Sequence, residues 1–475
     1  MVGRMSLLEK YGTHWLFIFT VSLGVIASQF MNKGYRNPVA DEYAYLAIAE
    51  DIQTFGTFTN GSLTEASEPP DTPGAFVSPA YPFFLYVTTA LTEKSQKGLL
   101  CIHNRQNIAD GLCNLEDLNA AFITQIILAA ISIVFIYFTI WHLFHSHVTS
   151  WSVIFLVLVT GTHAHYARHF LTENLAFLFF YMIGFFLVIA LSRRNMIWWV
   201  LLGASIGLAA LARPSYFYLI YMIPVMILVV DKLIRKHPLS RALLNTFVLI
   251  ISCYVVLLPW MIRNYLILDD FTITNGYASF ILAQRISYNA MTWPEFFVSF
   301  IYWLPDFGDS LAAMLFNEHF YDRLSWDSHQ SYYQLGVGML DSTLHEAGSK
   351  QDHLSHLVNK YIFGDLIKHL LVTIPIALRG MWVGKYFGLI GVLLFFPAIY
   401  ILTTRSQAMI FICLASVSLF MLGFHAFVSV NVVRYNEPLM VIYAISIVVF
   451  FSQLTKVVGR RRTRRMFDQR ERRHV

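Results

Sequence analysis

The sequence predicts an all-α polytopic membrane protein with about ten transmembrane helices and two long external segments. The composition, the long apolar runs and the placement of basic residues all point to this class. Of the 475 residues, 56% are hydrophobic and 13% are charged, whereas a soluble domain carries roughly 25% charged residues. The 40 Phe residues suit lipid-facing helices and interfacial aromatic belts. These values exclude a soluble globular protein.

Ten apolar runs have about the length and composition that a membrane-spanning helix needs. The first run is followed by acidic residues and not by a small-residue cleavage site, so we interpret it as a span and not as a signal peptide. The ten expected spans lie at 14–31, 118–141, 148–165, 171–191, 196–212, 214–230, 242–261, 386–403, 407–428 and 434–454. A further apolar run at 366–383 contains Lys368, His369 and Arg379, and we expect it to lie at the interface without crossing.

Basic residues of the short loops gather on one side of the membrane, which the positive-inside rule makes cytoplasmic. Nine of the 34 basic residues lie between 456 and 475, directly after the last apolar run, where they would contact anionic headgroups. Both termini are therefore expected in the cytoplasm, and no nucleic-acid partner is expected for the tail. The residues that set this orientation are Arg4, Lys10, Arg193, Arg194, Lys232, Arg235, Lys236, Arg241, Arg405 and the arginines of the tail.

The chain divides accordingly into four parts. A transmembrane module at 1–265 includes a first external loop at 32–115, and a second external segment with an interfacial helix follows at 266–385. C-terminal transmembrane helices at 386–455 precede the basic cytoplasmic tail at 456–475. Cys101 and Cys113 lie in the first external loop, where they form either a disulfide or a pair of free thiols.

Two adjacent carboxylates, Asp41 and Glu42, follow the first span by ten residues and are flanked by Tyr43 and Tyr45. An acid at this depth can act as a general base on an incoming hydroxyl or amine. The alternative is structural: Asp41 would cap a short helix that ends near Gly56, and the helix dipole would favour Glu42.

Polar groups also gather at the external ends of later spans. Arg213, Arg263 and Arg434 lie at three of these ends, and Tyr435 follows the last of them. A shared phosphate or diphosphate of a lipid-linked donor would explain several arginines at one depth, because guanidinium binds phosphate through two parallel hydrogen bonds. The alternative is that each arginine extends separately to lipid headgroups.

His165, His169 and Glu173 have a spacing that would place them on one helical face and invite a metal. We expect a chain turn among them, and no further ligand is evident, so we predict no metal. The sequence also contains no glycine-rich phosphate loop, no serine nucleophile elbow and no CxxC pair, and we predict no cofactor. A sugar donor would therefore be linked to a lipid and not to a nucleotide.

At these residues the chain resembles the GT-C glycosyltransferases, in particular bacterial relatives of protein O-mannosyltransferases and lipid A aminoarabinose transferases. The likeness covers most of residues 10–450. Its motifs are DEYAYLAIAEDI (41–52), SPAYPFFLY (78–86), LTENLAFLFF (171–180), LARPSYFYL (211–219), PWMIRNY (259–265) and RYNEP (434–438).

The resemblance implies a membrane glycosyltransferase with a polyprenyl-phosphate-linked sugar donor and a glycolipid, glycan or protein acceptor. It implies that Asp41 is the catalytic base for direct, inverting displacement, with Glu42 as its neighbour and Glu173 as a second acid. Arg263 and Arg434 would bind the donor phosphate, with Arg213 as a third. The active site would then face the periplasm from a bacterial inner membrane.

Two other functions remain open at this stage. A transporter or flippase for an anionic lipid or glycan would be expected to place ionisable groups near the middle of the membrane, often within repeated halves. The charged motifs lie instead at one end of the spans, and no internal repeat is visible. A membrane scaffold would leave the acidic pair and the arginines without a shared purpose.

Overall fold

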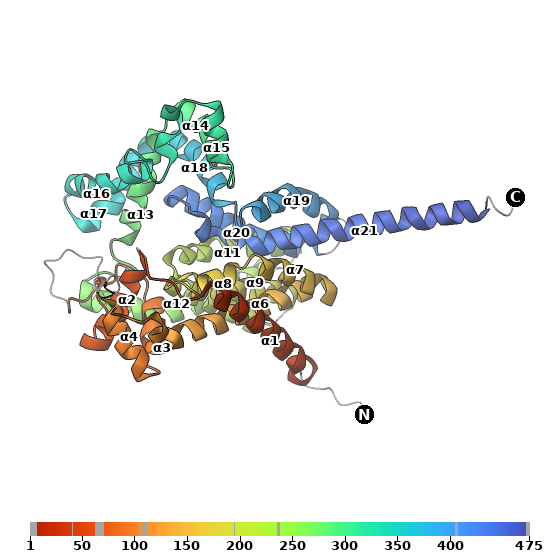
Figure 1. The fold of residues 1–475 in the computed structure, drawn as a ribbon, viewed down its shortest axis with the longest axis horizontal. Helices are drawn as coiled ribbons and strands as arrows, with labels where there is room; N and C mark the ends of the chain where they lie inside the picture. The colour runs from red at the N-terminus through yellow and green to blue at the C-terminus, as the bar shows by residue number, and fades with distance from the viewer. Residues whose placement is uncertain are drawn as a thin grey trace.

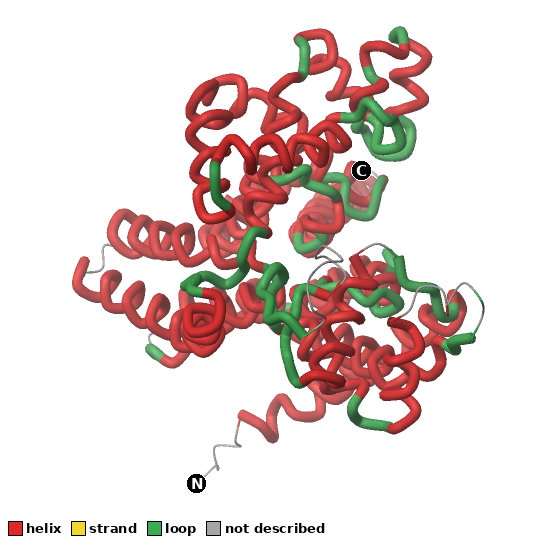
Figure 2. Tube along the Cα trace, turned by 90° about the vertical axis from the view of Figure 1, so that its left-hand side faces the viewer, coloured by secondary structure: helices red, strands yellow, loops and turns green. Residues whose placement is uncertain are grey.

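The computed structural model describes residues 7–39, 41–61, 71–103, 107, 110, 112–193, 195–234, 238–403 and 407–471. Within these ranges every regular element is a helix and none is a strand (Figure 2), which confirms the predicted all-α class. The orientation argument rested partly on residues whose backbone or side chains lie outside this description, namely Arg4, Lys10, Arg194, Arg235, Lys236, Arg405 and the arginines of the tail.

Nine helical segments in the described ranges are long and apolar enough to cross a membrane. Eight of them coincide with predicted spans, and the ninth is the segment Asp352–Gly380. The helices that form the eight are α1 (Leu7–Lys33), α6 (Asn119–Phe144), α9 (Glu173–Ser192), α11 (Leu219–Val229), α12 (Leu239–Leu268), α19 (Tyr386–Thr403), α20 (Ala408–Val428) and α21 (Leu439–Glu471).

Two predicted spans are shorter than a bilayer requires. α10 (Ile197–Ala212) has 16 residues, and α7 (His147–Val159) has 13, which is about 20 Å of helix. The prediction of a span over 148–165 is therefore wrong at its end. Gly161 adopts a φ of +68°, which stops the helix, and a separate short helix, α8 (Thr162–Tyr166), follows it.

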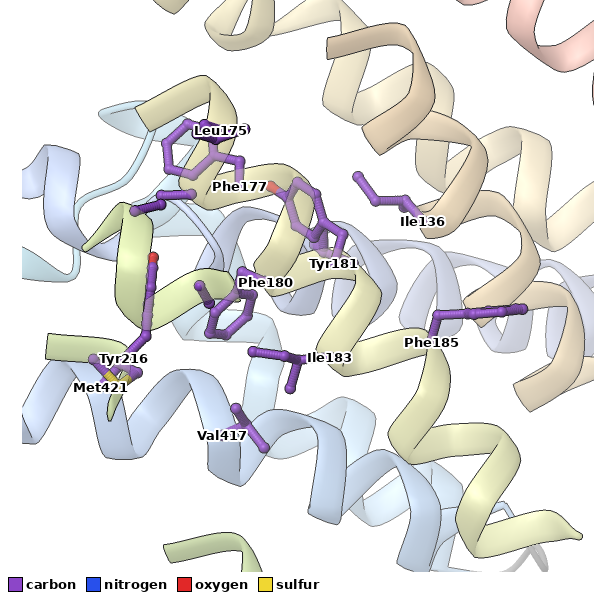
Figure 3. Packing of buried hydrophobic residues seen from close by; sticks show 14 of the residues in the cluster. Ile136, Leu175, Phe177, Phe180, Tyr181, Ile183, Phe185, Tyr216, Val417 and Met421 are labelled. Carbon is purple, nitrogen blue, oxygen red and sulfur yellow. The ribbon is translucent and has the colours of Figure 1, made fainter. Parts of the chain in front are cut away.

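The core of the bundle forms around α9. Seventeen of its 20 residues are buried. The ring of Phe180 packs against that of Tyr216 in η3 (Pro214–Tyr218), and Ile183 lies beside Val417 of α20 (Figure 3). Next to it, α10 approaches α12 closely through two glycines: a Cβ atom added at Gly203 would lie 2.2 Å from a carbonyl oxygen of α12. Small residues four positions apart permit such contact between membrane helices.

The first external loop folds onto one end of the bundle as α2 (Asp41–Phe55), α3 (Ala80–Thr89) and α4 (Glu93–His103). The predicted helix at Asp41 is confirmed, and it ends as expected before Gly56, which has a φ of +67°. A disulfide joins Cys101 to Cys113, so the alternative of two free thiols is wrong. We call this end of the bundle, where α2 lies, the α2 end.

The second external segment forms a helical lobe with its own apolar clusters. Its helices are α13 (Tyr277–Ile286), α14 (Trp293–Tyr302), α15 (Gly308–Leu315), α16 (Tyr332–Ala347), α17 (Lys350–Leu357) and α18 (Leu366–Gly380).

α18 belongs to this lobe although its composition would allow a span. Nε2 of His369, near its start, lies 2.9 Å from the carbonyl of Phe427, and Gly380, at its end, contacts Asn431 and Asn436. The start of α18 therefore lies beside the last turn of α20, and its end lies beside the segment that follows α20. The expectation that this segment lies at the interface without crossing the membrane stays a prediction.

The starts and ends of the long helices define two opposite ends of the molecule. In Figure 1, α2, α4, α16 and α17 lie on the left, whereas the beginning of α1 and the end of α21 lie on the right. Figure 2 views the α2 end directly. α9 and α21 begin at this end and α10 finishes there, so residues distant in sequence meet on one surface.

Candidate active site

A pocket opens at the α2 end, with an empty volume of about 450 Å³ that includes space open to solvent. Six separate stretches of the chain line it. Its lining residues are Asp41, Tyr45, Val77, Ser78, Leu171, Thr172, Glu173, Ala212, Arg213, Pro214, Tyr277, Arg434 and Tyr435. Six of the ten residues predicted for the site therefore lie at one pocket.

Four charged side chains of opposite sign alternate along this pocket. Nη2 of Arg434 donates to Oδ2 of Asp41 at 2.7 Å, and Nε of Arg434 lies 3.7 Å from Oε1 of Glu173. Nη1 of Arg213 donates to the same Glu173 oxygen at 3.4 Å. Glu173 is almost fully buried, whereas the Asp41 side chain is exposed. Asp41 is thus the carboxylate of the pair that an incoming molecule can reach.

The two arginines share an aromatic neighbour, Tyr435. The guanidinium carbon of Arg213 lies 4.1 Å from the centre of its ring, and that of Arg434 lies 5.5 Å away. Burial on its own lowers the pKa of Arg434, but Glu173, Tyr435 and Asp41 raise it above its ordinary value. Both guanidinium groups are therefore fixed and positively charged, as an anion-binding site requires.

Glu42 does not line the pocket, although it was expected in the catalytic set beside Asp41. Its carboxylate is buried and binds Arg36 at 3.0 Å, Nδ1 of His169 at 2.9 Å and the backbone N–H of Phe170 at 3.1 Å. Glu42 therefore anchors the first turn of α2 to the segment that leads into Glu173. The sequence places the two acids side by side, but successive residues of a helix point in different directions.

Arg263 is also outside the pocket, and its contacts give no support to the phosphate-binding role expected for it. Its guanidinium donates to the carbonyls of Gly74 at 2.6 Å and Phe58 at 3.1 Å, and it lies 4.8 Å from the Trp260 ring. Each of these contacts ties α12 to the first external loop. Arg263 therefore holds the loop in place, and Arg213 and Arg434 are the arginines at the pocket.

His165 and Tyr43 do not line the pocket either. The His165 ring lies 4.5 Å from that of His169, and Tyr43 is half-buried on α2. His169 binds Glu42 and contacts Arg36, while Glu173 pairs with arginines, so these histidines do not converge on Glu173. In the described ranges no three His, Cys, Asp or Glu side chains are grouped to hold a metal.

Glu437, from the RYNEP motif, lies behind the pocket. Its Oε1 accepts a hydrogen bond from Tyr166 at 3.5 Å, and its Oε2 is buried without a hydrogen-bond partner among the described residues. Burial raises the pKa of Glu437 to about 8, with the charge of Glu173 acting in the same direction. Glu437 is therefore mainly protonated at neutral pH.

Tyr277 is the pocket residue that the sequence did not single out. It begins α13, in the second external segment, immediately after Gly276, whose φ of +83° turns the chain back over the first loop. The backbone N–H of Asn275 donates to the carbonyl of Ala75, which joins the two loops. Ser78 and Thr172 were also not named, although both lie in segments that carried the family resemblance.

Comparison with known proteins gives one family match and one similar solved structure. Residues 113–261 match the model of a family described as dolichyl-phosphate-mannose-protein mannosyltransferase. Among solved structures, the fold is similar to that of the archaeal oligosaccharyltransferase AglB from Archaeoglobus fulgidus, solved in complex with an inhibitory peptide and a dolichol-phosphate. The TM-score is 0.50 and the identity 12%, and the match covers 96% of this chain and 52% of that chain. The chain therefore spans about half the length of AglB.

No curated protein sequence matches the chain. The matched segment extends from before α6 into α12 and includes Glu173 and Arg213, whereas Asp41 and Arg434 lie outside it. The family model and the shared fold together confirm the resemblance of this chain to the GT-C membrane glycosyltransferases.

Proposed function

We propose that this protein is an inverting membrane glycosyltransferase. It moves a hexosyl or pentosyl unit from a polyprenyl phosphate to a glycolipid, glycan or protein acceptor, on the outer face of a bacterial cytoplasmic membrane. The observation that carries the proposal is the alternation of Asp41, Arg434, Glu173 and Arg213 along one pocket at the end of an apolar bundle. The family match at 113–261 supports a lipid-linked donor.

The proposed reaction is a single displacement. The Asp41 carboxylate takes the proton of the acceptor hydroxyl or amine, and the acceptor atom attacks the anomeric carbon of the sugar. The bond between that carbon and the phosphate oxygen breaks, and the electron pair leaves with the lipid phosphate. Arg213 and Arg434 stabilise the negative charge that gathers on this leaving group, so no general acid is required.

Donor phosphate and carboxylates compete for the same guanidinium groups. Without donor, Arg434 pairs with Asp41 and both arginines contact Glu173. A phosphate between Arg213 and Arg434 would take the place of Asp41 at Arg434, because guanidinium binds phosphate through two hydrogen bonds. Asp41 would then be released toward the acceptor. We therefore expect donor to bind before acceptor.

The proposal is tested by mass spectrometry of envelope glycolipids and glycans from three strains: wild type, a deletion strain and the deletion strain carrying Asp41→Asn. We expect one species to lose a sugar-sized mass in the deletion strain, and Asp41→Asn, expressed at the wild-type level, not to restore it. Glu346→Gln, a charge change on an exposed residue of the second external segment, is the matched control and should restore it.

Restoration by Asp41→Asn would remove Asp41 from the mechanism and make Glu173 the next base to test. An unchanged set of glycans in the deletion strain would contradict glycosyl transfer. A transporter of an anionic lipid or glycan would then be the better explanation of the arginines.

A further inference from the structure

Glu173 lies where three helix ends meet at the pocket. It is the first residue of α9, where the helix dipole favours a negative charge. Arg213 directly follows α10, and Arg434 lies in the short turn before α21. Oε1 of Glu173 accepts a hydrogen bond from Nη1 of Arg213 at 3.4 Å and lies 3.7 Å from Nε of Arg434. One carboxylate oxygen therefore contacts both arginines of the pocket.

The two arginines are more accessible than the carboxylate that joins them. The side chain of Arg434 is 33% exposed and that of Arg213 is 12% exposed, whereas that of Glu173 is 2% exposed. The second oxygen of Glu173, Oε2, accepts a hydrogen bond from the Thr172 hydroxyl at 3.5 Å. An anion that enters the pocket therefore meets guanidinium groups, and Glu173 is better placed to hold these groups than to take a proton from an acceptor.

The charges at the pocket are matched before any donor binds. The two arginines carry two positive charges, and Asp41 and Glu173 supply two negative ones. Glu437, the acid behind the pocket, is mainly protonated at neutral pH, because burial raises its pKa to about 8. The side chain of Asp41 is exposed, and a phosphate can replace it at Arg434. Glu173 is buried and stays in place, so a bound phosphate shares the two arginines with one permanent carboxylate.

The proposed donor and the lipid product differ in charge. The donor phosphate is bonded to both the lipid and the sugar, so it is a phosphodiester with one negative charge. After transfer, the lipid phosphate is a monoester with a second pKa of about 6, and its charge at pH 7 is about −1.5 to −2. Two arginines and one carboxylate match the charge of the diester. The monoester brings more negative charge than the same groups can match.

We propose that Glu173 is a positioning residue that makes the pocket favour the phosphodiester donor over the phosphomonoester product. This inference rests on the proposed glycosyl transfer and adds how the site releases its lipid product. Glu173 fixes both guanidinium groups around one oxygen, and its permanent negative charge repels the second charge of the lipid phosphate. Without this carboxylate, the two arginines would match the dianion and retain it.

A purely structural role for Glu173 would give a different result. If Glu173 only kept the arginines in place, its loss would weaken the binding of the diester and of the monoester alike. A charge that acts on the bound phosphate changes the two affinities unequally, because the interaction between two charges is proportional to their product. The ratio of the two affinities therefore separates the two roles.

The test is titration of the full-length protein in lipid nanodiscs near pH 7.5. The probes are undecaprenyl phosphate and its methyl ester, which is a phosphodiester of the same lipid. We expect the wild type to bind the methyl ester at least as tightly as the monoester. Glu173→Gln should shift the ratio of the two dissociation constants toward the monoester by about tenfold or more.

Two further variants should keep the wild-type ratio. Glu173→Asp retains the negative charge. Glu295→Gln removes a buried acid of the second external segment, which pairs with Arg323 at 3.5 Å, and is the matched control.

Thermal unfolding identifies variants that do not fold. If Glu173→Gln is one of them, the double change of Glu173→Gln with Arg213→Gln carries the test, because it removes one charge of each sign. The double variant should keep the wild-type ratio, and a shift toward the monoester there would overturn the proposal.

Equal weakening of both lipids by folded Glu173→Gln would overturn the role of Glu173 and leave the donor site in place. A wild type that binds the monoester about tenfold more tightly than the diester would do the same. Binding of neither lipid would remove the donor site, and with it both the proposed function and this inference. A failure of the proposed function is thus distinguishable from a failure of this inference alone.

Discussion

Arg434 donates a hydrogen bond to Asp41 at 2.7 Å, although 393 positions separate the two residues in the sequence. This contact joins α2 to the short turn η10 (Val433–Asn436) that precedes α21. It brings the acidic motif that starts at Asp41 to the RYNEP motif at 434–438. The predictions below concern this pair, the residues that position it and the protonated acid behind it.

Replacing Arg434 by Gln should weaken donor binding roughly 10- to 100-fold, because it removes charge-assisted hydrogen bonds worth about 1.5–3 kcal/mol. The acceptor KM should change little. Titration of the purified protein with undecaprenyl phosphate measures the affinity of the donor site, and Arg434→Lys should recover part of the lost affinity. An undiminished affinity in a folded Arg434→Gln protein would place the phosphate elsewhere.

Arg263→Ala should leave undecaprenyl phosphate binding within about threefold of the wild type, because Arg263 contacts loop carbonyls and not the pocket. It should lower stability by about 1–3 kcal/mol through the loss of its hydrogen bonds to the carbonyls of Gly74 and Phe58. Thermal unfolding in detergent measures the loss. Arg213→Ala is the comparison variant and should weaken undecaprenyl phosphate binding. If Arg263→Ala weakened this binding and Arg213→Ala did not, Arg263 would return to the phosphate site.

Glu42→Gln should lower stability by about 2–4 kcal/mol, because Arg36 loses the carboxylate that neutralises it and His169 loses the carboxylate it contacts. The rate of transfer should fall because Asp41 is no longer held in place, while donor affinity stays close to the wild type. Unfolding, donor titration and single-turnover rates together separate these effects. A Glu42→Gln protein of normal stability that transfers no sugar would instead make Glu42 a reacting group.

Stability should fall as the pH rises from 6 to 9, in part because of Glu437. Burial raises its pKa to about 8, whereas an unfolded glutamate has a pKa near 4.5. Between pH 4.5 and pH 8, the folded state therefore holds a proton that the unfolded state has lost. The stabilising contribution of protonated Glu437 is full below pH 4.5 and disappears as the pH rises past 8. The groups that act on Glu437 are Tyr166 and Glu173.

Glu437→Gln mimics the protonated acid and should lose less stability than the wild type over this pH range. The difference between the two proteins should reach about 2 °C in unfolding midpoint or more. Glu346→Gln, an exposed acid in the second external segment, serves as the control. Parallel curves for wild type and Glu437→Gln would show that Glu437 is not the titrating group.

The apolar pattern was sufficient to predict the helical class, eight of the ten spans and the helix that starts at Asp41. Those features depend on contacts within a few residues and on the burial of continuous apolar runs, both of which are visible in a sequence. The end of α7 was not predicted, because the positive φ of Gly161 is a property of one backbone position. The sequence likewise contained the two cysteines without deciding that they pair.

The sequence by itself determined which residue types occupy the ends of the spans, and six of the ten named residues meet at the pocket. Tertiary structure decided the partner of each. Glu42 adjoins Asp41 but faces His169, and Arg263 resembles Arg213 in its position at a helix end but binds backbone carbonyls. Tyr277 joins the pocket from a distant segment. Local pattern fixes where a charged group stands along a helix, whereas its partner depends on side-chain direction and on the packing of elements hundreds of residues apart.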